Sequence, residues 1–384
     1  MARGRIFKKD SGSYAFRVDV GTDAATGKRR QLQRSGFRTK KDAEAALQKI
    51  LQEVADGTAA ARSAKELGPF VTEWLETQRQ HLKATTWESY RVAVDRIDQH
   101  LGHRPVRDLT PLEIEAFYAQ LSESGARSGK PLAPKSVRNT HVVLRKALAD
   151  AERLGMVARN AASAARPPTS RPPEQRTWDS DQIAQFFQNV AEDRLRASYI
   201  LAATTGMRRG EVLGLRWADV DLDARQLAIR QTLTTVNYQP VIAAPKSKRS
   251  VRVIYLDDHS VDVLRSHRRR QVEERQALPG TWDGSHDLVF RDEVGEPINP
   301  DWFSREFTRR VKASGLPSIR FHDLRHSYAT LALKAGVHPK IVSERLGHAT
   351  VGITLDLYSH VTPAIARDAA DVVAAQLFSS SDDA

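Results

Sequence analysis

Residues 321–360 read FHDLRHSYATLALKAGVHPKIVSERLGHATVGITLDLYSH. Apolar residues recur at helical spacing in the first part of this stretch, so we predict a helix from Phe321 to Lys334. His322, Arg325 and His326 fall at i, i+3 and i+4 of this helix and therefore share one face. That face combines a permanent cation with two groups that change charge near neutral pH.

A second helix is predicted directly after the first. Gly336 ends the first helix, and Pro339 suits the first turn of the next because its missing N–H would be unpaired there anyway. The apolar side of this second helix is predicted to consist of Ile341, Val342 and Leu346. Gly347 ends it, His348 follows on a bend, and Tyr358 lies on a further short helix.

These side chains together suit a site for a phosphate group. Arginine presents a planar fork of donors that matches phosphate oxygens. Histidine donates hydrogen bonds or moves protons, and a tyrosine hydroxyl becomes a covalent nucleophile once its proton is removed. Each residue alone also fits a solvated helix face or a packing tyrosine; it is the cluster that favours a phosphate-binding active site.

Two further motifs precede this stretch. Residues 205–211 read TGMRRGE, and residues 246–252 read KSKRSVR. Together with His-x-x-Arg-His, Leu-Gly-His and a later tyrosine, they stand in the order of the motifs of the tyrosine recombinase (phage integrase) family, which the chain therefore resembles. Ser247 replaces the threonine of the family pattern, a change that keeps the hydroxyl.

The resemblance implies a catalytic set of Arg208, Lys246, His322, Arg325, His348 and Tyr358. In the family's reaction, Tyr358 would attack a DNA phosphodiester, forming a 3′-phosphotyrosine link and releasing a 5′-hydroxyl. Arg208 and Arg325 would hold the nonbridging oxygens, and His348 would donate a third hydrogen bond. Lys246 would protonate the leaving 5′-oxygen as a general acid.

Three supporting roles follow from the same resemblance. His322 would accept the tyrosine proton, and His326 would brace the pocket rather than react. Glu211, three residues after Arg208, would orient an arginine, although an acid at a helix N-terminus is also common. Because the covalent link conserves bond energy, no nucleotide is required, and we find no Walker motif. Clustered carboxylates of the kind that hold Mg²⁺ are absent from the motif region, so no cofactor is expected.

The charge balance of the whole chain favours a polyanionic partner. Lys and Arg total 59 against 47 Asp and Glu among 384 residues, a formal net charge of +12. There is no cysteine, so neither a disulfide framework nor a thiolate metal site is expected. We find no apolar run of membrane-spanning length and no signal-peptide core, so we expect a cytoplasmic, nucleoid-associated protein.

The chain is too long for one ordinary core, so we predict a multidomain α+β protein. Residues 1–62 would form a small β-sheet with a helix, resembling the arm-type DNA-binding domain of integrases. Residues 66–160 would form an all-α, SAM-like core-binding domain. Residues 174–384 would form a mainly α catalytic domain with a small antiparallel β-sheet. Proline pairs in residues 166–173 mark the clearest boundary.

Basic side chains near the N-terminus are candidates for DNA contact. Residues 14–20 and 28–34 read as strands, and Thr39 would cap a helix from residue 40 to about 56. The sheet face opposite this helix would bind DNA through Arg17, Arg29, Arg30 and Arg34. The alternative is a basic sheet that is merely solvated. In the core-binding domain four helices are predicted, and the candidates are Thr85, Lys135, Arg138 and Arg145.

The catalytic domain should alternate helices with a few strands. A helix capped by Asp179 or Ser180 is predicted to carry Ile183, Phe186 and Phe187. Further helices are predicted at residues 196–204, 258–277 and 302–314, and strands at residues 227–236, 250–256 and 287–291. Lys246 falls in the loop between the first two of these strands.

The sequence therefore predicts a site-specific tyrosine recombinase, the integrase of a phage or integrative mobile element. It would recombine double-stranded attachment sites of core and arm type through a Holliday junction, as a homotetramer on DNA. A host DNA-bending protein and an excision directionality factor are further expected partners. The apolar residues 372–378 would dock onto a neighbouring subunit or pack within their own chain.

Other functions remain as alternatives. A chromosome-dimer resolvase belongs to the same family but lacks an arm domain, and a type IB topoisomerase shares the chemistry without partner sites. A non-enzymatic DNA-binding regulator would not need the full catalytic set. A zinc hydrolase would use His322 and His326, but Asp323 stands where a zincin helix has glutamate, and Arg325 would lie beside the metal.

Overall fold

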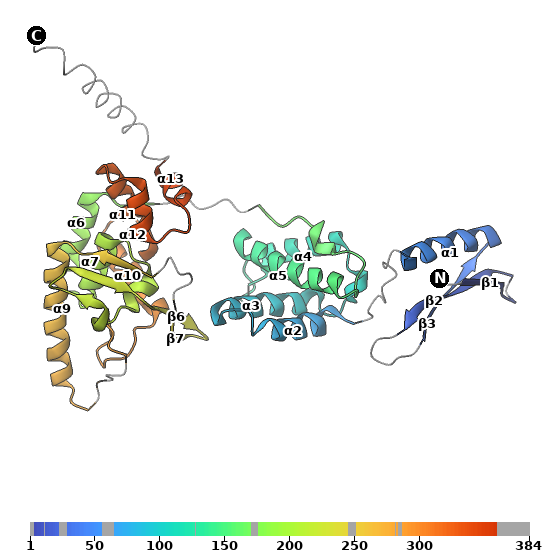
Figure 1. The fold of residues 1–384 in the computed structure, drawn as a ribbon, viewed down its shortest axis with the longest axis horizontal. Coiled ribbons are helices and arrows are strands. Elements are labelled where there is room, and N and C mark those ends of the chain that lie inside the picture. Colours follow the sequence, from blue (N-terminus) through green and yellow to red (C-terminus); the bar gives the residue numbers. More distant parts are fainter. Residues whose placement is uncertain are drawn as a thin grey trace, which may run out of the picture. The chain divides into compact units, whose positions relative to one another are not determined.

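The structure is a computed structural model that describes residues 4–10, 12–22, 29–55, 65–126, 128–169, 176–244, 251–280, 282 and 286–358 (Figure 1). The chain divides into two compact units, residues 1–172 and 173–384, and each is described by itself. The finer boundaries at residues 62, 66, 160 and 174 stay predictions. None of the helices that the structure describes is both long and apolar enough to span a membrane.

The N-terminal part of the first unit is a three-stranded antiparallel sheet covered by one helix. The strands are β1 (Gly4–Lys8), β2 (Tyr14–Thr22) and β3 (Arg29–Phe37), in the order β1-β2-β3, followed by helix α1 (Lys40–Ala55). The predicted sheet and helix are confirmed, and β1 is an addition to the two expected strands. Buried apolar side chains of β2 pack on the helix, and the Thr39 hydroxyl accepts the Asp42 N–H as its cap.

The register of the sheet gives Arg34 a different face from the one expected, while DNA contact by the four arginines stays a prediction. Arg17 lies opposite Gln33, is exposed, and donates to its side chain at 2.7 Å. Arg34 lies opposite Phe16, which is fully buried under α1. Because partners in an antiparallel pair point to the same face, Arg34 belongs to the helix-covered face and not to the free one. The side chains of Arg29 and Arg30 lie outside the described part of the structure.

The second part of the first unit is the expected helical domain. It consists of α2 (Leu67–Gln78), α3 (Ala84–Leu101), α4 (Pro111–Ser124) and α5 (Pro134–Arg153) around one apolar core. Pro111 occupies the first turn of α4, behind a capping box between Thr110 and Glu113.

The candidate DNA-contact residues of this helical domain lie at its surface. Lys135, Arg138 and Arg145 are exposed along α5, and Thr85 is half-buried in the first turn of α3. Their accessibility fits phosphate contact, which stays a prediction.

The second unit builds mixed helices and short strands around its own core. Its helices are α6 (Ser180–Asn189), α7 (Arg196–Thr205), α8 (Arg209–Leu213), α9 (Asp258–Ala277), α10 (Pro300–Ala313), α11 (Phe321–Lys334), α12 (Pro339–Leu346) and α13 (Gly352–Tyr358). Its strands are β4 (Val220–Asp221), β5 (Gln226–Ile229), β6 (Thr232–Val236), β7 (Gln239–Ala243) and β8 (Arg252–Tyr255). They form one antiparallel sheet in the order β4-β5-β8 and a β6-β7 hairpin.

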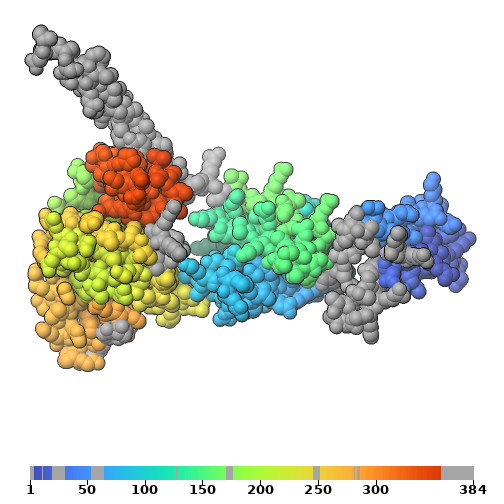
Figure 2. All heavy atoms as spheres, in the orientation of Figure 1, coloured from blue at the N-terminus to red at the C-terminus, as the bar shows by residue number. Residues whose placement is uncertain are grey.

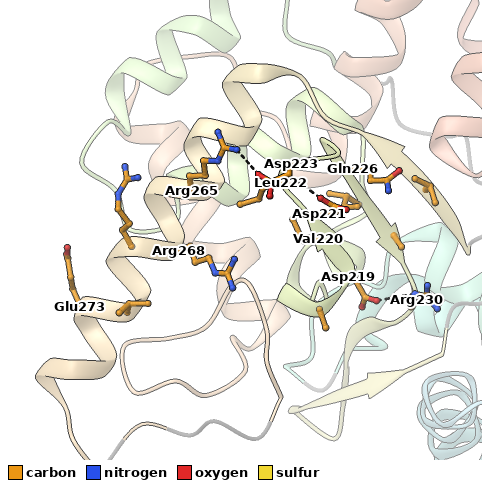
Figure 3. Close-up of a pocket in the computed structure, with 16 residues that line it drawn as sticks. Asp219, Val220, Asp221, Leu222, Asp223, Gln226, Arg230, Arg265, Arg268 and Glu273 are labelled. Atoms are coloured by element: carbon orange, nitrogen blue, oxygen red, sulfur yellow. Dashed lines mark hydrogen bonds and ion pairs between the residues drawn. The ribbon is translucent and has the colours of Figure 1, made fainter.

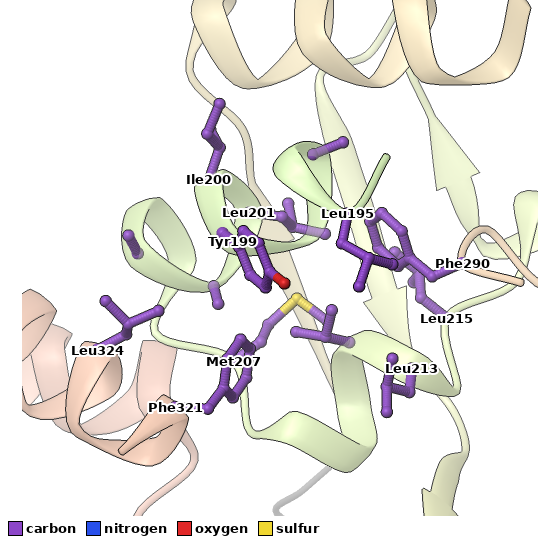
Figure 4. Close-up of a cluster of buried hydrophobic side chains, with 14 of the residues drawn as sticks. Leu195, Tyr199, Ile200, Leu201, Met207, Leu213, Leu215, Phe290, Phe321 and Leu324 are labelled. Carbon is purple, nitrogen blue, oxygen red and sulfur yellow. The ribbon is translucent and has the colours of Figure 1, made fainter. Parts of the chain in front are cut away.

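The core of the second unit joins the helix before the first arginine motif to the later histidine-bearing helix. Tyr199 on α7, Met207 after it and Phe321 on α11 point into the same cluster (Figure 4). The Phe307 ring on α10 lies within 6.4 Å, centroid to centroid, of aromatic rings on α6, α7 and α11 and of Trp178. The red atoms of the α11–α13 segment form one compact lobe of this unit (Figure 2).

Three expectations for the second unit are wrong. Residues 227–236 form two strands of separate sheets, not one. Residues 287–291 form only isolated bridges, because their apolar run is buried in the core while the Val289 N–H bonds to the Leu215 carbonyl. Ile341 is 56% exposed, so the buried side of α12 rests on Val342 and Leu346.

Phe307→Ala should lower the free energy of unfolding of the second unit by about 3–5 kcal/mol, because it removes the ring that four other rings contact. Denaturant unfolding of the full chain, followed by tryptophan fluorescence, measures it. Phe187→Ala removes a ring of the same size that is only partly buried and is the matched control. Equal losses in the two variants would contradict the central place of Phe307.

Candidate active site

The predicted site residues come from chain segments that the fold brings side by side. Helix α11 packs against α7 and α12, and α12 packs against α13 (Figure 1). The turn after α7 therefore meets the end of α12. Each of these helices ends where glycine permits a left-handed residue: Gly206 has φ +68° and Gly347 has φ +66°.

Arg208 lies at the start of α8 and is held by Glu211. The Glu211 carboxylate accepts the Arg208 backbone N–H at 2.9 Å and its Nη1 at 2.8 Å. The other terminal nitrogen, Nη2, donates to the Gly347 carbonyl at 2.9 Å. Glu211 is only 3% exposed, and its position as an orienting acid agrees with the expectation from the motif.

Arg325 is buried on α11 and is solvated by main-chain oxygens. Its Nη1 donates to the Gly206 carbonyl and its Nη2 to the Leu346 carbonyl, both at 2.8 Å. Burial, and then the charge of Arg208, lower the pKa of Arg325 to about 9, which leaves it charged at neutral pH. Among the described residues it makes no ion pair, so a bound anion would relieve this buried charge.

The three histidines of the motifs all have pKa values below that of an ordinary histidine. Burial lowers the pKa of His348 to about 4, and Arg325 and Arg208 add to the shift. The pKa of His322 is lowered by desolvation and by His326, whose ring centroid lies 5.1 Å away, and the pKa of His326 is also lowered. The Nδ1 atom of His348 lies 2.8 Å from the Thr354 hydroxyl on α13. At neutral pH each ring therefore keeps one nitrogen able to accept a proton.

A cavity of about 430 Å³ opens over these groups, and its walls include Arg208, Glu211, His322 and His348. The β6 strand supplies further lining residues, so the hairpin forms one wall. Arg325 does not line the cavity but shares the Leu346 carbonyl with Arg208, whose Nη1 approaches it at 3.4 Å. The fold thus gathers four of the six predicted catalytic residues.

The side chains of the other two predicted catalytic residues, Tyr358 and Lys246, lie outside the described part of the structure. The backbone of Tyr358 ends α13, as expected, and its side chain lies outside the described part of the structure. Lys246 falls in residues 245–250, also outside it, between β7 and β8. Residues 372–378 lie outside the described part as well.

The structure adds neighbours that the sequence analysis did not select. Arg252 donates to both Glu211 oxygens, at 3.1 and 2.9 Å, and Arg345 donates to the Tyr255 carbonyl. The signal for Arg252 was its place at the end of the lysine motif. Nothing in the local sequence marked Arg345, or Thr354 as the partner of His348.

A larger cavity in the same unit is separate from this site. It measures about 1020 Å³ and lies between β4, β5 and α9 (Figure 3). None of the predicted catalytic residues lines it. Several of its charges are already paired, Arg265 with Asp223 and Arg230 with Asp219.

Among the residues that the structure describes, no three His, Cys, Asp or Glu side chains are grouped so as to hold a metal ion. The zincin-like pair, His322 and His326, has Arg325 on the same helix, as the sequence indicated.

Sequence profiles of three domains match consecutive parts of the chain. The arm DNA-binding domain matches residues 6–54, the N-terminal SAM-like domain of phage integrases matches residues 67–122, and the phage integrase family matches residues 176–364. The chain belongs to the tyrosine recombinase (phage integrase) family. It is therefore an enzyme of the class that cuts and rejoins DNA, as the motifs indicated.

Relatives of this recombinase match it over nearly their whole length. A XerC-like tyrosine recombinase of Caldanaerobacter subterraneus is 28% identical over 91% of this chain and 93% of its own. The ICEBs1 integrase of Bacillus subtilis is 27% identical over 95% of this chain and 98% of its own.

Among solved structures, the Tn1549 transposon integrase in complex with a circular intermediate DNA has a TM-score of 0.67 at 19% identity, over 80% of this chain and 99% of that one. The lambda integrase dimer bound to a core site has a TM-score of 0.57 at 20% identity, over 92% and 93%. These likenesses confirm the predicted α+β fold class of the recombinase.

Gly206→Ala should destabilise the recombinase more than Gly336→Ala. Both glycines have positive φ, so alanine costs about 1 kcal/mol at either site. Only at position 206 would the new Cβ collide with Leu346 and lie 2.8 Å from the Tyr328 ring, adding about 1–3 kcal/mol. Denaturant unfolding measures both, and equal losses would contradict the tight packing under Arg208.

The His348 ring should remain neutral well below its ordinary pKa in the DNA-free recombinase. The folded pKa is lowered, so the unfolded chain takes up this proton first and the stability falls as pH drops below about 6.5. NMR signals of the His348 ring should show no midpoint between about pH 5.5 and pH 8. A midpoint near 6.5 would contradict the burial of this ring beside two arginines.

Proposed function

We propose that this recombinase is a site-specific integrase of a phage or another integrative mobile element. The observation that carries the proposal is the cavity that gathers Arg208, His322 and His348 over the buried Arg325 in a chain of this family. The arm DNA-binding profile at residues 6–54 favours an integrase over a chromosome-dimer resolvase, which lacks that domain. The likeness to the ICEBs1 integrase over 95% of the chain supports a mobile element.

The phosphate of the scissile DNA bond would occupy the cavity. Arg208, which lines the cavity, and Arg325, which lies buried behind it, would stabilise the negative charge that builds on the nonbridging oxygens. Both are fixed before the reaction, Arg208 by Glu211 and the Gly347 carbonyl and Arg325 by two main-chain carbonyls. If the Thr354 hydroxyl donates to Nδ1 of His348, Nε2 carries the proton and becomes the third donor.

Tyr358 is the proposed nucleophile. The bond between its hydroxyl oxygen and phosphorus forms while the bond from phosphorus to the 5′-oxygen breaks. The tyrosine proton passes to His322, whose lowered pKa keeps it unprotonated at neutral pH, and Lys246 gives a proton to the 5′-oxygen. Position 358 lies one helical turn after Thr354 on α13, and this i, i+4 spacing from the partner of His348 supports the assignment.

The 5′-hydroxyl of a second strand would reverse the step and complete strand exchange through a Holliday junction. A homotetramer on paired core and arm sites, assisted by a host DNA-bending protein and a directionality factor, is the proposed assembly. The substrate places the enzyme in the cytoplasm at the nucleoid. Residues 372–378 supply an apolar segment for contact with a neighbouring subunit, or within their own chain.

Tyr358→Phe should abolish covalent attachment of the enzyme to DNA, because the attacking hydroxyl is gone. DNA flanking the gene supplies candidate attachment sites, and a nicked suicide duplex traps the protein–DNA product on a denaturing gel. Tyr238→Phe removes an exposed hydroxyl in the same unit and should leave the product unchanged. Covalent product from the Tyr358→Phe variant at the wild-type level would overturn the assignment.

Arg208→Ala and Arg325→Ala should each lower the rate of cleavage about a hundredfold or more, as loss of one preorganised donor does. Affinity for the duplex should change little, because many other basic side chains contact phosphates. Single-turnover cleavage and gel-shift titration separate the two effects. Loss of binding without loss of the bound-state cleavage rate would contradict the assigned role.

A further inference from the structure

Arg252 occupies a position that connects three parts of the site. It is the first residue of β8, and its side chain is only 8% exposed. Its two terminal nitrogens donate to the two oxygens of Glu211, and its Nε donates to the Arg345 carbonyl at 2.7 Å. One planar guanidinium thereby joins β8 to the start of α8 and to the last turn of α12.

The bond to Glu211 acts on Arg208. Oε1 of Glu211 accepts from Nη1 of both arginines, while Oε2 accepts from the Arg208 backbone N–H and from Nη2 of Arg252. Rotation of the carboxylate would therefore break bonds to Arg208 as well. The fork of Arg252 fixes the plane of the acid that aims Arg208 into the cavity.

The hydrogen bond from Arg252 to the Arg345 carbonyl fixes the backbone that leads to the other site residues. The next two carbonyls along the chain, of Leu346 and Gly347, accept from Arg325 and Arg208. His348 follows directly. A shift of this short backbone segment would move both guanidinium groups and His348 together.

We propose that Arg252 is a positioning residue of the recombinase, which sets the common geometry of Arg208, Arg325 and His348 through Glu211 and the end of α12. This inference rests on the proposed function, because the geometry matters for a phosphate held by those three groups. Arg252 itself is buried and is not among the residues that line the cavity, so its role would be exerted through the groups that it holds.

A purely structural arginine of the same kind exists in the same unit and serves as the control. Arg194 donates to both oxygens of Glu274, at 2.8 and 2.7 Å, and to the carbonyls of Arg291 and Asp292. Its side chain is 21% exposed, and in the described part of the structure its bonding partners include none of the site residues. Its loss should lower stability without changing the chemistry.

Arg252→Gln should slow cleavage of the suicide duplex about a hundredfold while the affinity for DNA is kept, since a small misplacement of catalytic groups has that effect. Arg252→Lys keeps the charge but cannot reach Glu211 and the Arg345 carbonyl with one planar fork, so a loss of about tenfold is expected. Arg194→Gln should cleave at the wild-type rate at a temperature where it is folded.

The pH dependence of cleavage distinguishes a positioning role from a purely structural one, because loss of stability alone would not move the pH profile. Burial raises the pKa of the Glu211 carboxyl, but the hydrogen bond and charge of Arg252, together with Arg208, outweigh burial and hold it below its ordinary value. Without Arg252 the pKa of Glu211 rises, so Glu211 becomes protonated at a higher pH than in the wild type. The acid limb of the cleavage profile should therefore move to higher pH.

Because other titratable groups lie around Glu211, the effect of Arg252→Gln on the pH profile is also measured in the Glu211→Gln variant. Arg208 faces Glu211 from its own turn, Arg325 from α11, and the pocket also holds His322 and His348. In Glu211→Gln, most of the shift caused by Arg252→Gln should disappear, because the carboxyl that carries it is absent. A shift of full size in that background would assign the effect to the histidines and overturn the proposal.

The remaining outcomes are decisive as well. If Tyr358→Phe still cleaves the duplex at the wild-type rate, the proposed function is refuted. If Tyr358→Phe is inactive but Arg252→Gln behaves like the wild type, only the role of Arg252 is refuted. Circular dichroism melts check folding. If Arg252→Gln does not fold, Arg252→Lys decides: a slower rate with a moved acid limb supports the role, and a profile like that of Arg194→Gln overturns it.

Discussion

The site depends on a surplus of positive charge, carried by the buried Arg252 and Arg325 and by the partly exposed Arg208. Arg208, Arg252 and Arg325 surround a single carboxylate, Glu211, in the described part of the structure. Buried charges without partners are costly, and the lowered pKa values of Arg325 and His348 have the sign that this surplus predicts. An anion in the cavity would remove the imbalance. The fold is therefore prepared for an anion, which in the proposed function is the phosphate of the DNA.

Two helix C-termini make this surplus tolerable. Helices α7 and α12 end at Gly206 and Gly347, and the carbonyls at those ends accept bonds from Arg325 and Arg208. The end of a helix carries partial negative charge, so the guanidinium groups are solvated by dipoles and not by carboxylates. Dipoles hold a cation without neutralising it. A second carboxylate in their place would have cancelled the charge that an anion needs.

The sequence predicts the parts of this arrangement whose cause is local. Glycine and proline mark the ends of α7, α11 and α12 because they act within a turn of their own position. The pairing of Arg252 with Glu211 could not be predicted in this way, since it joins segments 41 residues apart. The same holds for Arg34, whose face is decided by its register against Phe16. Residues 287–291 show the third limit: a short buried apolar run reads alike whether it forms a strand or fills a core.

The helix that carries Tyr358 packs against α11 and α12, and a hydrogen bond joins it to His348 of the anion site. Thr354 on α13 is fully buried and meets His348, while its neighbours Ile353 and Leu355 are about half exposed. The groups that would stabilise charge are fixed by α7, α11 and α12, whereas α13 is a short helix at the edge of the described fold. In the proposed function His348 would therefore have two tasks. Its Nδ1 lies within hydrogen-bond distance of Thr354 on the helix that carries Tyr358, and its other ring nitrogen would face the phosphate. Occupation of the anion site and placement of the proposed nucleophile would then depend on the same side chain.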